Sequence, residues 1–208
     1  MDEPVFIAIE GIDASGKTTL TAALASALRH KGLTVAEHKE PSRGPVGEFF
    51  RRMSTTGRWP AMTMALLSSA DRYQQQDYLA TARQRYQVVL ADRYYLSGLT
   101  YHAADGIDPA YYQQLNRDVA KPDAYLYLDI TPALAATRKR GGPDGYWEER
   151  DFAVRLPAAY DACLALVTDT EAAHVIRIDA SKPPHAVLGT ALAAICALRP
   201  DLLERIGE

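Results

Sequence analysis

The sequence predicts an α/β fold of three layers, in which helices flank a central parallel sheet of about five strands. Apolar runs of strand length recur along the chain and alternate with longer segments of helical pattern. This order produces crossover connections and parallel strands. The runs are almost continuously apolar, as expected for strands whose two faces are both covered. The 208 residues suit a single domain, and we expect residues 1–208 to form one unit.

The expected strands are the runs VFIAIE (5–10), LTVAEH (33–38), YQVVLAD (86–92), AYLYLDI (124–130) and HVIRID (174–179). The expected helices occupy residues 18–32, 46–53, 61–86, 108–120, 132–140, 151–170 and 184–198. Gly32 suits the C-terminus of the first helix. The segment 61–86 has the pattern of one long helix. GGPDG at 141–145 interrupts these patterns and fits either a plain surface loop or a short mobile lid over about residues 139–151.

Composition and charge exclude several classes of protein. The formal net charge of −3 provides no overall positive field for nucleic acid, so we expect no nucleic-acid partner. No apolar run approaches membrane-spanning length, and the first residues lack a secretory signal pattern. We therefore expect a cytoplasmic protein with no membrane partner. Cys163 and Cys196 lie in apolar segments, and we expect both to be reduced core residues.

The stretch GIDASGKTTL at 11–20 contains a specific motif. Gly11, Gly16, Lys17 and Thr18 satisfy G-x-x-x-x-G-K-[ST], directly after an apolar strand and at the start of a helix. Glycines let successive backbone N–H groups face phosphate oxygens, the lysine reaches the outer phosphates, and the hydroxyl lies on Mg²⁺. The helix N-terminus also favours anions. We predict a P-loop that binds ATP through Gly11, Ala14, Ser15, Gly16, Lys17, Thr18 and Thr19.

Three classes of P-loop protein are possible: a switch GTPase, a motor-type ATPase and a small-molecule kinase. A GTPase should carry a guanine-reading N-K-x-D sequence after a later strand, and this chain has none. A motor ATPase usually needs a larger chain. A small kinase needs a second phosphate site, built from isolated arginines at strand ends and helix starts. The chain contains such arginines, which favours the kinase.

Asp92 and Arg93 follow the third expected strand. The carboxyl ends of parallel strands face the ligand crevice, so both charges should lie near the P-loop. Asp92 would hold Mg²⁺, and Arg93 would bind a phosphate with two hydrogen bonds. The alternative is a surface ion pair. Asp71 and Arg72 lie in the middle of an expected helix, where on their own they suggest an ordinary solvated pair.

Asp13 lies inside the P-loop, where a carboxylate is electrostatically unfavourable unless it contacts a hydroxyl, an amine or a metal. The alternative for Asp13 is a local Asx turn. Arg138, Arg140 and Arg150 flank the glycine-rich stretch. They are either solvated helix ends or lid arginines that neutralise the charge of a transferring phosphoryl group.

Together these segments resemble the thymidylate kinase (dTMP kinase) family of P-loop nucleoside monophosphate kinases over nearly the whole chain. The similar segments are FIAIEGIDASGKTT, KEP followed by GPVGEFFRRM, ALLSSADRYQQ, VVLADRYYLSGLTYH, KPDAYLYLDITPALAATRKRGG and EERDFAVRLPAAYDACL. The resemblance implies transfer of the γ-phosphoryl group of ATP to the 5′-phosphate of a pyrimidine deoxynucleotide, most directly dTMP. It also implies Mg²⁺ as cofactor, nucleotides as the small-molecule partners, and a homodimer.

The resemblance also implies roles for individual residues. Thr18 and Asp92 would hold the metal, and Lys17, Asp13, Arg93 and one lid arginine would be catalytic. Because Ala14 and Ser15 leave the P-loop without an arginine, the lid must supply it, from Arg138, Arg140 or Arg150.

For the acceptor, the resemblance implies that Arg93 and Arg43 bind phosphate and that Arg72 binds the base. Tyr101 would pack on the deoxyribose, while Pro41 would border the 5-position of the base. The acceptor would thus contact Asp13, Pro41, Arg43, Ser68, Arg72, Arg93, Ser97, Gly98 and Tyr101.

The chain departs from the family pattern at the base. Ser68 stands where the family has a stacking aromatic, and losing that ring removes roughly 1–3 kcal/mol of base binding. Lys39 replaces the arginine of R-E-P, Ser42 and Arg43 replace two glycines, and Thr100 and His102 flank Tyr101 in place of alanine and glutamine. Either another aromatic replaces the ring, with Tyr73, Trp59 and Phe49 near in sequence, or the acceptor is not ordinary dTMP.

Three functions therefore stay open. The first is a dTMP kinase. The second is a kinase of the same fold for another or modified deoxynucleotide or for a deoxynucleoside; a nucleoside would need a general base, for which Glu10 or Asp13 is available. The third is an inactive nucleotide-binding regulatory protein, against which the intact Lys17, Thr18, Asp92 and Arg93 argue.

Overall fold

The computed structural model describes residues 4–57, 59–139, 150–171 and 174–200. Its centre is one five-stranded sheet in the order β2-β3-β1-β4-β5, with every neighbouring pair parallel. The strands are β1 (Val5–Glu10), β2 (Val35–Lys39), β3 (Val88–Asp92), β4 (Ala124–Asp129) and β5 (His174–Asp179). The predicted parallel sheet of five strands is confirmed. Residues 6–9 of β1 are fully buried, as its continuous apolar run predicts.

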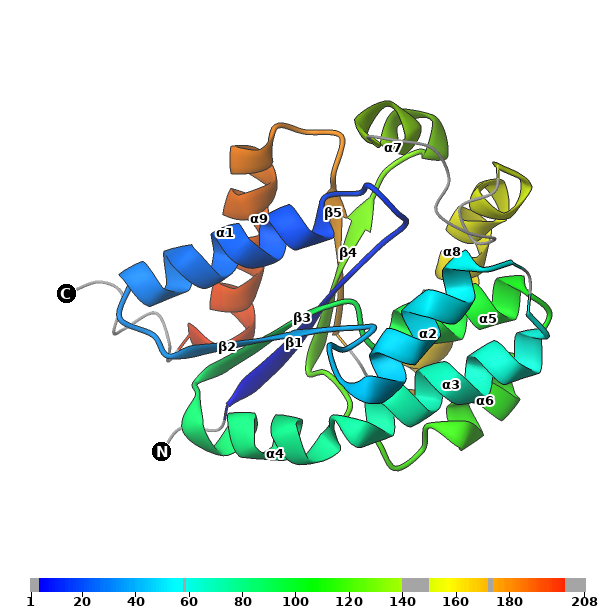
Figure 1. Cartoon of the computed structure of the whole chain (residues 1–208). Helices are drawn as coiled ribbons and strands as arrows, with labels where there is room; N and C mark the ends of the chain where they lie inside the picture. Colours follow the sequence, from blue (N-terminus) through cyan, green and yellow to red (C-terminus); the bar gives the residue numbers. More distant parts are fainter. Residues whose placement is uncertain (1–3, 58, 140–149, 172–173, 201–208) are drawn as a thin grey trace.

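The helices lie on both faces of this sheet (Figure 1). They are α1 (Lys17–His30), α2 (Pro45–Thr55), α3 (Ala61–Gln74), α4 (Gln76–Arg85), α5 (Tyr95–Ala104), α6 (Pro109–Leu115), α7 (Pro132–Arg138), α8 (Arg150–Glu171) and α9 (Pro184–Leu198). Helices α1 and α9 contact each other on one face, while α4 and α8 contact strands on the other. The three-layer prediction is therefore confirmed. Four helices begin with proline, which suits a position whose N–H has no helical partner.

The strand order places the P-loop at a switch in the winding of the sheet. The chain leaves β1 to one side for β2 and β3, and then crosses to the other side for β4 and β5. The connections that follow neighbouring strands diverge at such a point and leave a crevice at the carboxyl ends. The segments after β1, β2 and β3 all reach this edge of the sheet, as Figure 1 shows. The crevice is where the predicted site residues should meet.

Two predicted helices differ from the structure. The expected single helix over 61–86 is two helices, α3 and α4, separated at Gln75, whose N–H donates to Arg72 O in a tighter turn. Leu79 and Ala82 of α4 pack in the core, whereas α3 packs on α2 and α5. The two helices therefore have different packing partners. The expected helix over 108–120 is shorter and ends at Leu115, because the next side chain, Asn116, bonds inside the protein.

Both cysteines are free thiols. Cys163 of α8 is a buried core residue as expected, whereas Cys196 of α9 is only half-buried. The GGPDG stretch and Arg140 lie outside the described residues, so the lid remains a prediction from sequence. Within the described part of the chain, no helix is both long enough and apolar enough to cross a membrane.

Candidate active site

The loop between β1 and α1 has the geometry that its glycines allow. Gly11 has φ +145°, and a Cβ there would lie 2.8 Å from Ser15 Oγ and 2.9 Å from Leu128 O. Gly16, the N-cap of α1, has φ +102°. Both positions favour glycine for this reason. The loop borders a cavity of about 620 Å³, named here the phosphate cavity. Of the predicted ATP-binding residues, all but Gly11 line it.

Lys17 lies folded against its own loop. Its Nζ donates to Ile12 O at 2.6 Å and lies 3.4 Å from Ser15 Oγ. Burial lowers the pKa of Lys17 to about 7, because the ammonium has lost most of its water. A polyphosphate in the same cavity would replace that lost solvation with negative charge, which favours the protonated lysine. The position therefore suits an anion-binding lysine.

Thr18 and Asp92, the two predicted metal ligands, lie in contact although 74 residues separate them. Thr18 Oγ1 donates to Asp92 Oδ2 at 2.6 Å. The ammonium of Lys39 occupies the same corner, 2.7 Å from Asp92 Oδ2 and 3.1 Å from Thr18 Oγ1. Burial raises the pKa of Asp92, but the hydrogen bonds from Lys39 and Thr18 outweigh it and hold that pKa below its usual value.

The donor set at this corner suits a hard cation. A hydroxyl and a carboxylate supply oxygen ligands of the kind Mg²⁺ prefers, and the lysine ammonium shows that a positive charge fits between them. Among the described residues, no three His, Cys, Asp or Glu side chains converge on a metal position. A cation held by Thr18 and Asp92 would complete its coordination with water or with oxygens of a bound ligand.

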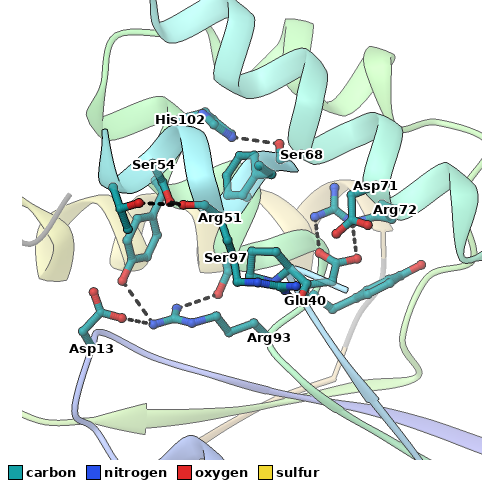
Figure 2. A pocket seen from close by; sticks show the side chains of 16 residues that line it. Asp13, Glu40, Arg51, Ser54, Ser68, Asp71, Arg72, Arg93, Ser97 and His102 are labelled. Carbon is teal, nitrogen blue, oxygen red and sulfur yellow. Dashed lines mark hydrogen bonds and ion pairs between the residues drawn. The ribbon is translucent and has the colours of Figure 1, made fainter. Parts of the chain in front are cut away.

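Arg93 lies on the wall between two cavities, with Asp13 beside it (Figure 2). Its Nη2 forms an ion pair with Asp13 Oδ1, and its Nη1 donates to Gly11 O and Ser97 Oγ, each at 3.1 Å. Nη2 also lies 3.4 Å from Tyr101 OH. Asp92 and Arg93 thus have different partners, and neither forms the alternative surface pair. Asp13 likewise pairs with Arg93, which explains how a carboxylate is accommodated in the loop.

The second cavity, named here the acceptor cavity, has a volume of about 370 Å³. It is lined by Asp13, Glu40, Pro41, Phe50, Arg51, Ser54, Thr55, Ser68, Asp71, Arg72, Arg93, Tyr94, Ser97, Gly98, Tyr101 and His102. These residues come from the P-loop, the segments after β2 and β3, and helices α2, α3 and α5. Every predicted acceptor residue except Arg43 is among them.

Arg43 is exposed and lines neither cavity, whereas Arg51 of α2 lines the acceptor cavity. Arg51 Nη1 donates to Pro41 O at 2.7 Å and to Ser42 O at 2.6 Å, so it also supports the loop after β2. Arg51 is not among the residues predicted from the sequence. The spacing of Gly47, Phe50 and Arg51 on one face of α2 was the available signal.

The pair Asp71–Arg72 is buried, so its interpretation as a solvated pair is wrong. Arg72 Nε donates to Glu40 Oε1 at 3.0 Å and Nη2 donates to Glu40 Oε2; Nη1 donates to Tyr112 OH and to Asn116 Oδ1. Asp71 instead accepts from the backbone N–H and the hydroxyl of Ser42. Four of the five N–H groups of Arg72 are engaged, which leaves one Nη2 hydrogen for a ligand at the cavity wall.

Arg72→Met is expected to reduce the free energy of unfolding by about 3–5 kcal/mol, because it leaves the buried Glu40 carboxylate without its partner. The measurement is urea unfolding at neutral pH. The matched control, Arg72→Met combined with Glu40→Met, removes both charges and should recover most of the loss. A single variant as stable as the wild type would show that the pair contributes little.

Ser68 takes part in a polar cluster at the wall of the acceptor cavity. Its hydroxyl lies 2.8 Å from His102 Nε2 and 3.0 Å from Tyr112 OH, and it donates to Ala65 O at 2.9 Å. Burial lowers the pKa of His102 to about 3, so its imidazole is neutral. The three aromatics suggested as replacements, Phe49, Trp59 and Tyr73, are exposed and do not line the cavity. Phe50, Tyr94 and Tyr101 do line it, and none of the three was suggested.

Of the three predicted lid arginines, only Arg138 has a described side chain. Arg138, at the end of α7, is exposed and lines the phosphate cavity. The backbone of Arg150 begins α8, and its side chain lies outside the described residues, as does all of Arg140. The structure therefore brings one of the three to the site.

Comparisons with known proteins agree with this geometry. The family model described as thymidylate kinase matches residues 9–189. A thymidylate kinase of Xanthomonas euvesicatoria pv. vesicatoria (strain 85-10) is 37% identical over 202 residues, which cover 96% of this chain and 86% of the relative. A thymidylate kinase of Xylella fastidiosa (strain 9a5c) is 34% identical over 194 residues, covering 92% of this chain and 90% of the relative. The chain belongs to the thymidylate kinase family.

Proposed function

We propose that this chain is a nucleoside monophosphate kinase that transfers the γ-phosphoryl group of ATP to the 5′-phosphate of dTMP and produces dTDP and ADP. The observation that carries the proposal is the shared wall. Asp13 and Arg93 border both the phosphate cavity and the acceptor cavity, so two phosphate groups bound in the two cavities would meet beside one guanidinium. Family membership supports the same activity.

The reaction needs positioning and charge neutralisation more than covalent catalysis. An oxygen of the acceptor phosphate attacks the γ-phosphorus, and the bond from that phosphorus to the bridging oxygen of ADP breaks. Because the acceptor phosphate is already ionised, no general base is required. Lys17 would bind the outer phosphates of ATP, Arg93 would hold the acceptor phosphate, and one of Arg138, Arg140 and Arg150 would cover the transferring group.

We propose Mg²⁺ as the cofactor, held by Thr18 and Asp92 together with nucleotide oxygens. The ion would neutralise charge on the β- and γ-phosphates. Lys39 can leave this corner, because more than half of its side chain is exposed. Its ammonium would then pair with other phosphate oxygens, which keeps the local charge balanced.

The alternative of a deoxynucleoside acceptor has little support. Glu10 is completely buried and lines neither cavity, and Asp13 is engaged with Arg93. Glu10 is therefore out of reach of a 5′-hydroxyl, and Asp13, which does line the acceptor cavity, is the ion-pair partner of Arg93 rather than a free base. A regulatory protein that only binds a nucleotide would need Lys17 and Thr18, but it would not require Arg93 on the wall of a second cavity. A different or modified base remains a genuine second candidate, because Ser68 changes the base pocket.

We also propose that residues 1–208 form a single domain with a lid over about 139–151, that the protein is cytoplasmic and does not bind nucleic acid, and that it is a homodimer. Support for the dimer comes from α3, where Met62, Leu66 and Tyr73 expose large apolar surfaces. Analytical ultracentrifugation at several protein concentrations tests it.

A coupled ADP-release assay with ATP and Mg²⁺ tests the function against dTMP, dUMP, dCMP, UMP, 5-substituted pyrimidine deoxynucleotides and thymidine. We expect the fastest turnover with dTMP. Preference for a larger 5-substituted base would identify Ser68 as the mark of an altered pocket. Tight ATP binding without turnover on any acceptor would overturn the kinase proposal.

Ser68→Phe is expected to lower KM for dTMP about tenfold, because an aromatic ring restores base stacking at this wall. The control Ser68→Ala removes the hydroxyl and its contact with His102 without adding a ring, and should leave KM for dTMP unchanged or higher. The measurement is steady-state kinetics at saturating ATP. If Ser68→Phe raises KM for dTMP, the space beside Ser68 is already used by the acceptor.

A further inference from the structure

Glu10 is the last residue of β1, and its carboxylate receives three hydrogen bonds from one neighbouring segment. Oε1 accepts from Tyr94 N at 2.9 Å and from Ser97 N at 3.2 Å, and Oε2 accepts from Ser97 Oγ. These N–H groups belong to the first turn of α5, whose own N-cap residue, Tyr94, supplies no side-chain acceptor. A carboxylate from another strand therefore caps this helix and complements the positive end of its dipole.

Arg93 immediately precedes this capped turn, and its backbone lies in an unfavourable region. Its φ is +67°, a left-handed conformation that residues other than glycine rarely adopt. Such conformations persist where the surroundings hold them, and they occur at functional sites. Here the N–H of Arg93 donates to Ile9 O at 3.0 Å, and the next N–H donates to Glu10. The last two residues of β1 thus hold the backbone on both sides of the Arg93 Cα.

The side chain of Arg93 is held through the same group. Ser97 Oγ donates to Glu10 and accepts from Arg93 Nη1 at 3.1 Å, and Tyr160 OH of α8 lies 3.2 Å from it. We propose that Glu10 is a positioning residue whose ionised carboxylate, through Ser97 and the first turn of α5, holds Arg93 in place for the acceptor phosphate. This inference rests on the proposed function, in which Arg93 binds that phosphate.

The charge of Glu10 is what distinguishes positioning from a merely structural role. Burial raises the pKa of Glu10 to about 7, against the lowering effects of Ser97, Arg93 and the N–H group of Tyr94. An amide oxygen at this position would still accept from the two N–H groups and would avoid the burial of a charge. If the residue only capped the helix, a neutral amide would therefore serve better than a carboxylate. The carboxylate has the additional effect of attracting the Arg93 guanidinium.

The other titratable groups that face Glu10 come from four elements. They are Arg93, Lys17 of α1, Tyr160 of α8, and Tyr127, which pairs with Glu10 in the β1–β4 register. Burial raises the pKa of Tyr127 to about 12 and that of Tyr160 well above its ordinary value, so both tyrosines stay neutral near pH 7. Lys17 also titrates near 7 without ligand, so the experiment is made at saturating ATP, whose phosphates keep the lysine protonated.

The raised pKa also predicts how stability depends on pH. The folded protein holds the Glu10 proton more tightly than the unfolded chain between pH 4.5 and about 7. The contribution of Glu10 to the free energy of unfolding therefore falls as pH rises through this range, and its full destabilising effect is present at pH 8. A glutamine does not titrate, so it makes no pH-dependent contribution of this kind. Glu10→Gln should therefore equal or exceed the wild type in Tm at pH 8.

The experiment compares wild type, Glu10→Gln and Ser97→Ala in KM for dTMP, KM for ATP and kcat from pH 6 to 9, together with Tm at pH 6 and 8. We expect Glu10→Gln to raise KM for dTMP about tenfold or more, with KM for ATP within about twofold of the wild type, by analogy with the loss of a group that orients a ligand-binding side chain. KM for dTMP in the wild type should also rise more steeply below pH 7 than in Glu10→Gln. Because the dTMP phosphate itself also titrates in this range, the pH dependence of KM in Glu10→Gln serves as the reference for that effect.

Ser97→Ala removes the side-chain link to Arg93 and leaves the two backbone N–H bonds to Glu10. It should raise KM for dTMP as Glu10→Gln does, and it carries the test if Glu10→Gln does not fold. An unchanged KM for dTMP in the folded variants, with or without a lower Tm, would overturn the positioning role. If the wild type binds ATP but phosphorylates no acceptor, the proposed function fails. In that case calorimetric binding of dTMP decides the inference: binding about tenfold weaker in Glu10→Gln supports it, and equal binding, or none to either protein, overturns it.

Discussion

Arg93→Met is expected to lower kcat/KM for dTMP by about 10³-fold, while the Kd for ATP stays close to that of the wild type. Arg93 is the cation on the wall that both cavities share, and its fork of N–H groups suits two hydrogen bonds to one phosphate. Removing one preorganised donor to a reacting oxyanion typically lowers kcat about 10²–10³-fold. Arg93→Met also removes a full charge that pairs with Asp13, so we expect the reduction to lie at or above the upper end of that range.

Two further variants sharpen this result. Arg93→Lys keeps the positive charge but loses the planar set of N–H donors, and its kcat/KM for dTMP should lie between those of the wild type and Arg93→Met. Arg117→Met is the matched control, because Arg117 is an exposed arginine that pairs with its neighbour Asp118 and lines neither cavity; its kinetics should match the wild type. If Arg93→Met keeps kcat/KM within tenfold, the acceptor phosphate binds elsewhere, and Arg51 becomes the first residue to replace.

Lys17→Met is expected to reduce kcat by about 10²–10³-fold and to weaken ATP binding, since no other lysine lies within the P-loop. Its Tm without ligand should equal or exceed that of the wild type, because the wild-type ammonium is buried at an unfavourable position. Loss of activity together with intact stability distinguishes a phosphate-binding role from a role in folding.

The measurements for Lys17→Met are steady-state ADP release, ATP titration by calorimetry, and thermal unfolding. Lys31→Met serves as the control, because Lys31 is exposed at the far end of α1. A Lys17→Met protein with near-normal kcat would contradict the assignment of the phosphate cavity to the outer phosphates of ATP.

Local patterns were sufficient for the sheet and the P-loop. Each strand is a short apolar run bounded by polar residues, and the spacing of Gly11, Gly16, Lys17 and Thr18 specifies a loop geometry without information from elsewhere in the chain. The meeting of Asp92 with Thr18 also followed from sequence, because carboxyl ends of parallel strands share one edge of the sheet. Helix boundaries depend on more than local pattern. The break at Gln75 arises because α3 and α4 pack on different partners, which no local pattern specifies.

Part of the candidate site also followed from sequence, through the order of the family segments, and part did not. Ser68, Arg72 and Tyr101 line the acceptor cavity as the resemblance implies, while Arg43 does not and Arg51 does. The difference arises because the segment after β2 turns back on α2, with Gly47 packed against the backbone of Ser42. This turn leaves Arg43 in solvent and brings Arg51 to the cavity.

The sequence by itself therefore determined the α/β sheet, the P-loop and its phosphate chemistry, and the class of enzyme. Only the tertiary structure decided which charges are buried and what each one contacts: Arg72 on Glu40, Asp71 on Ser42, and Glu10 on the first turn of α5. The physical reason is that loss of water and partner choice are properties of packing. A charged side chain that a sequence pattern assigns to solvent changes its energetics once residues 29 to 87 positions away close over it.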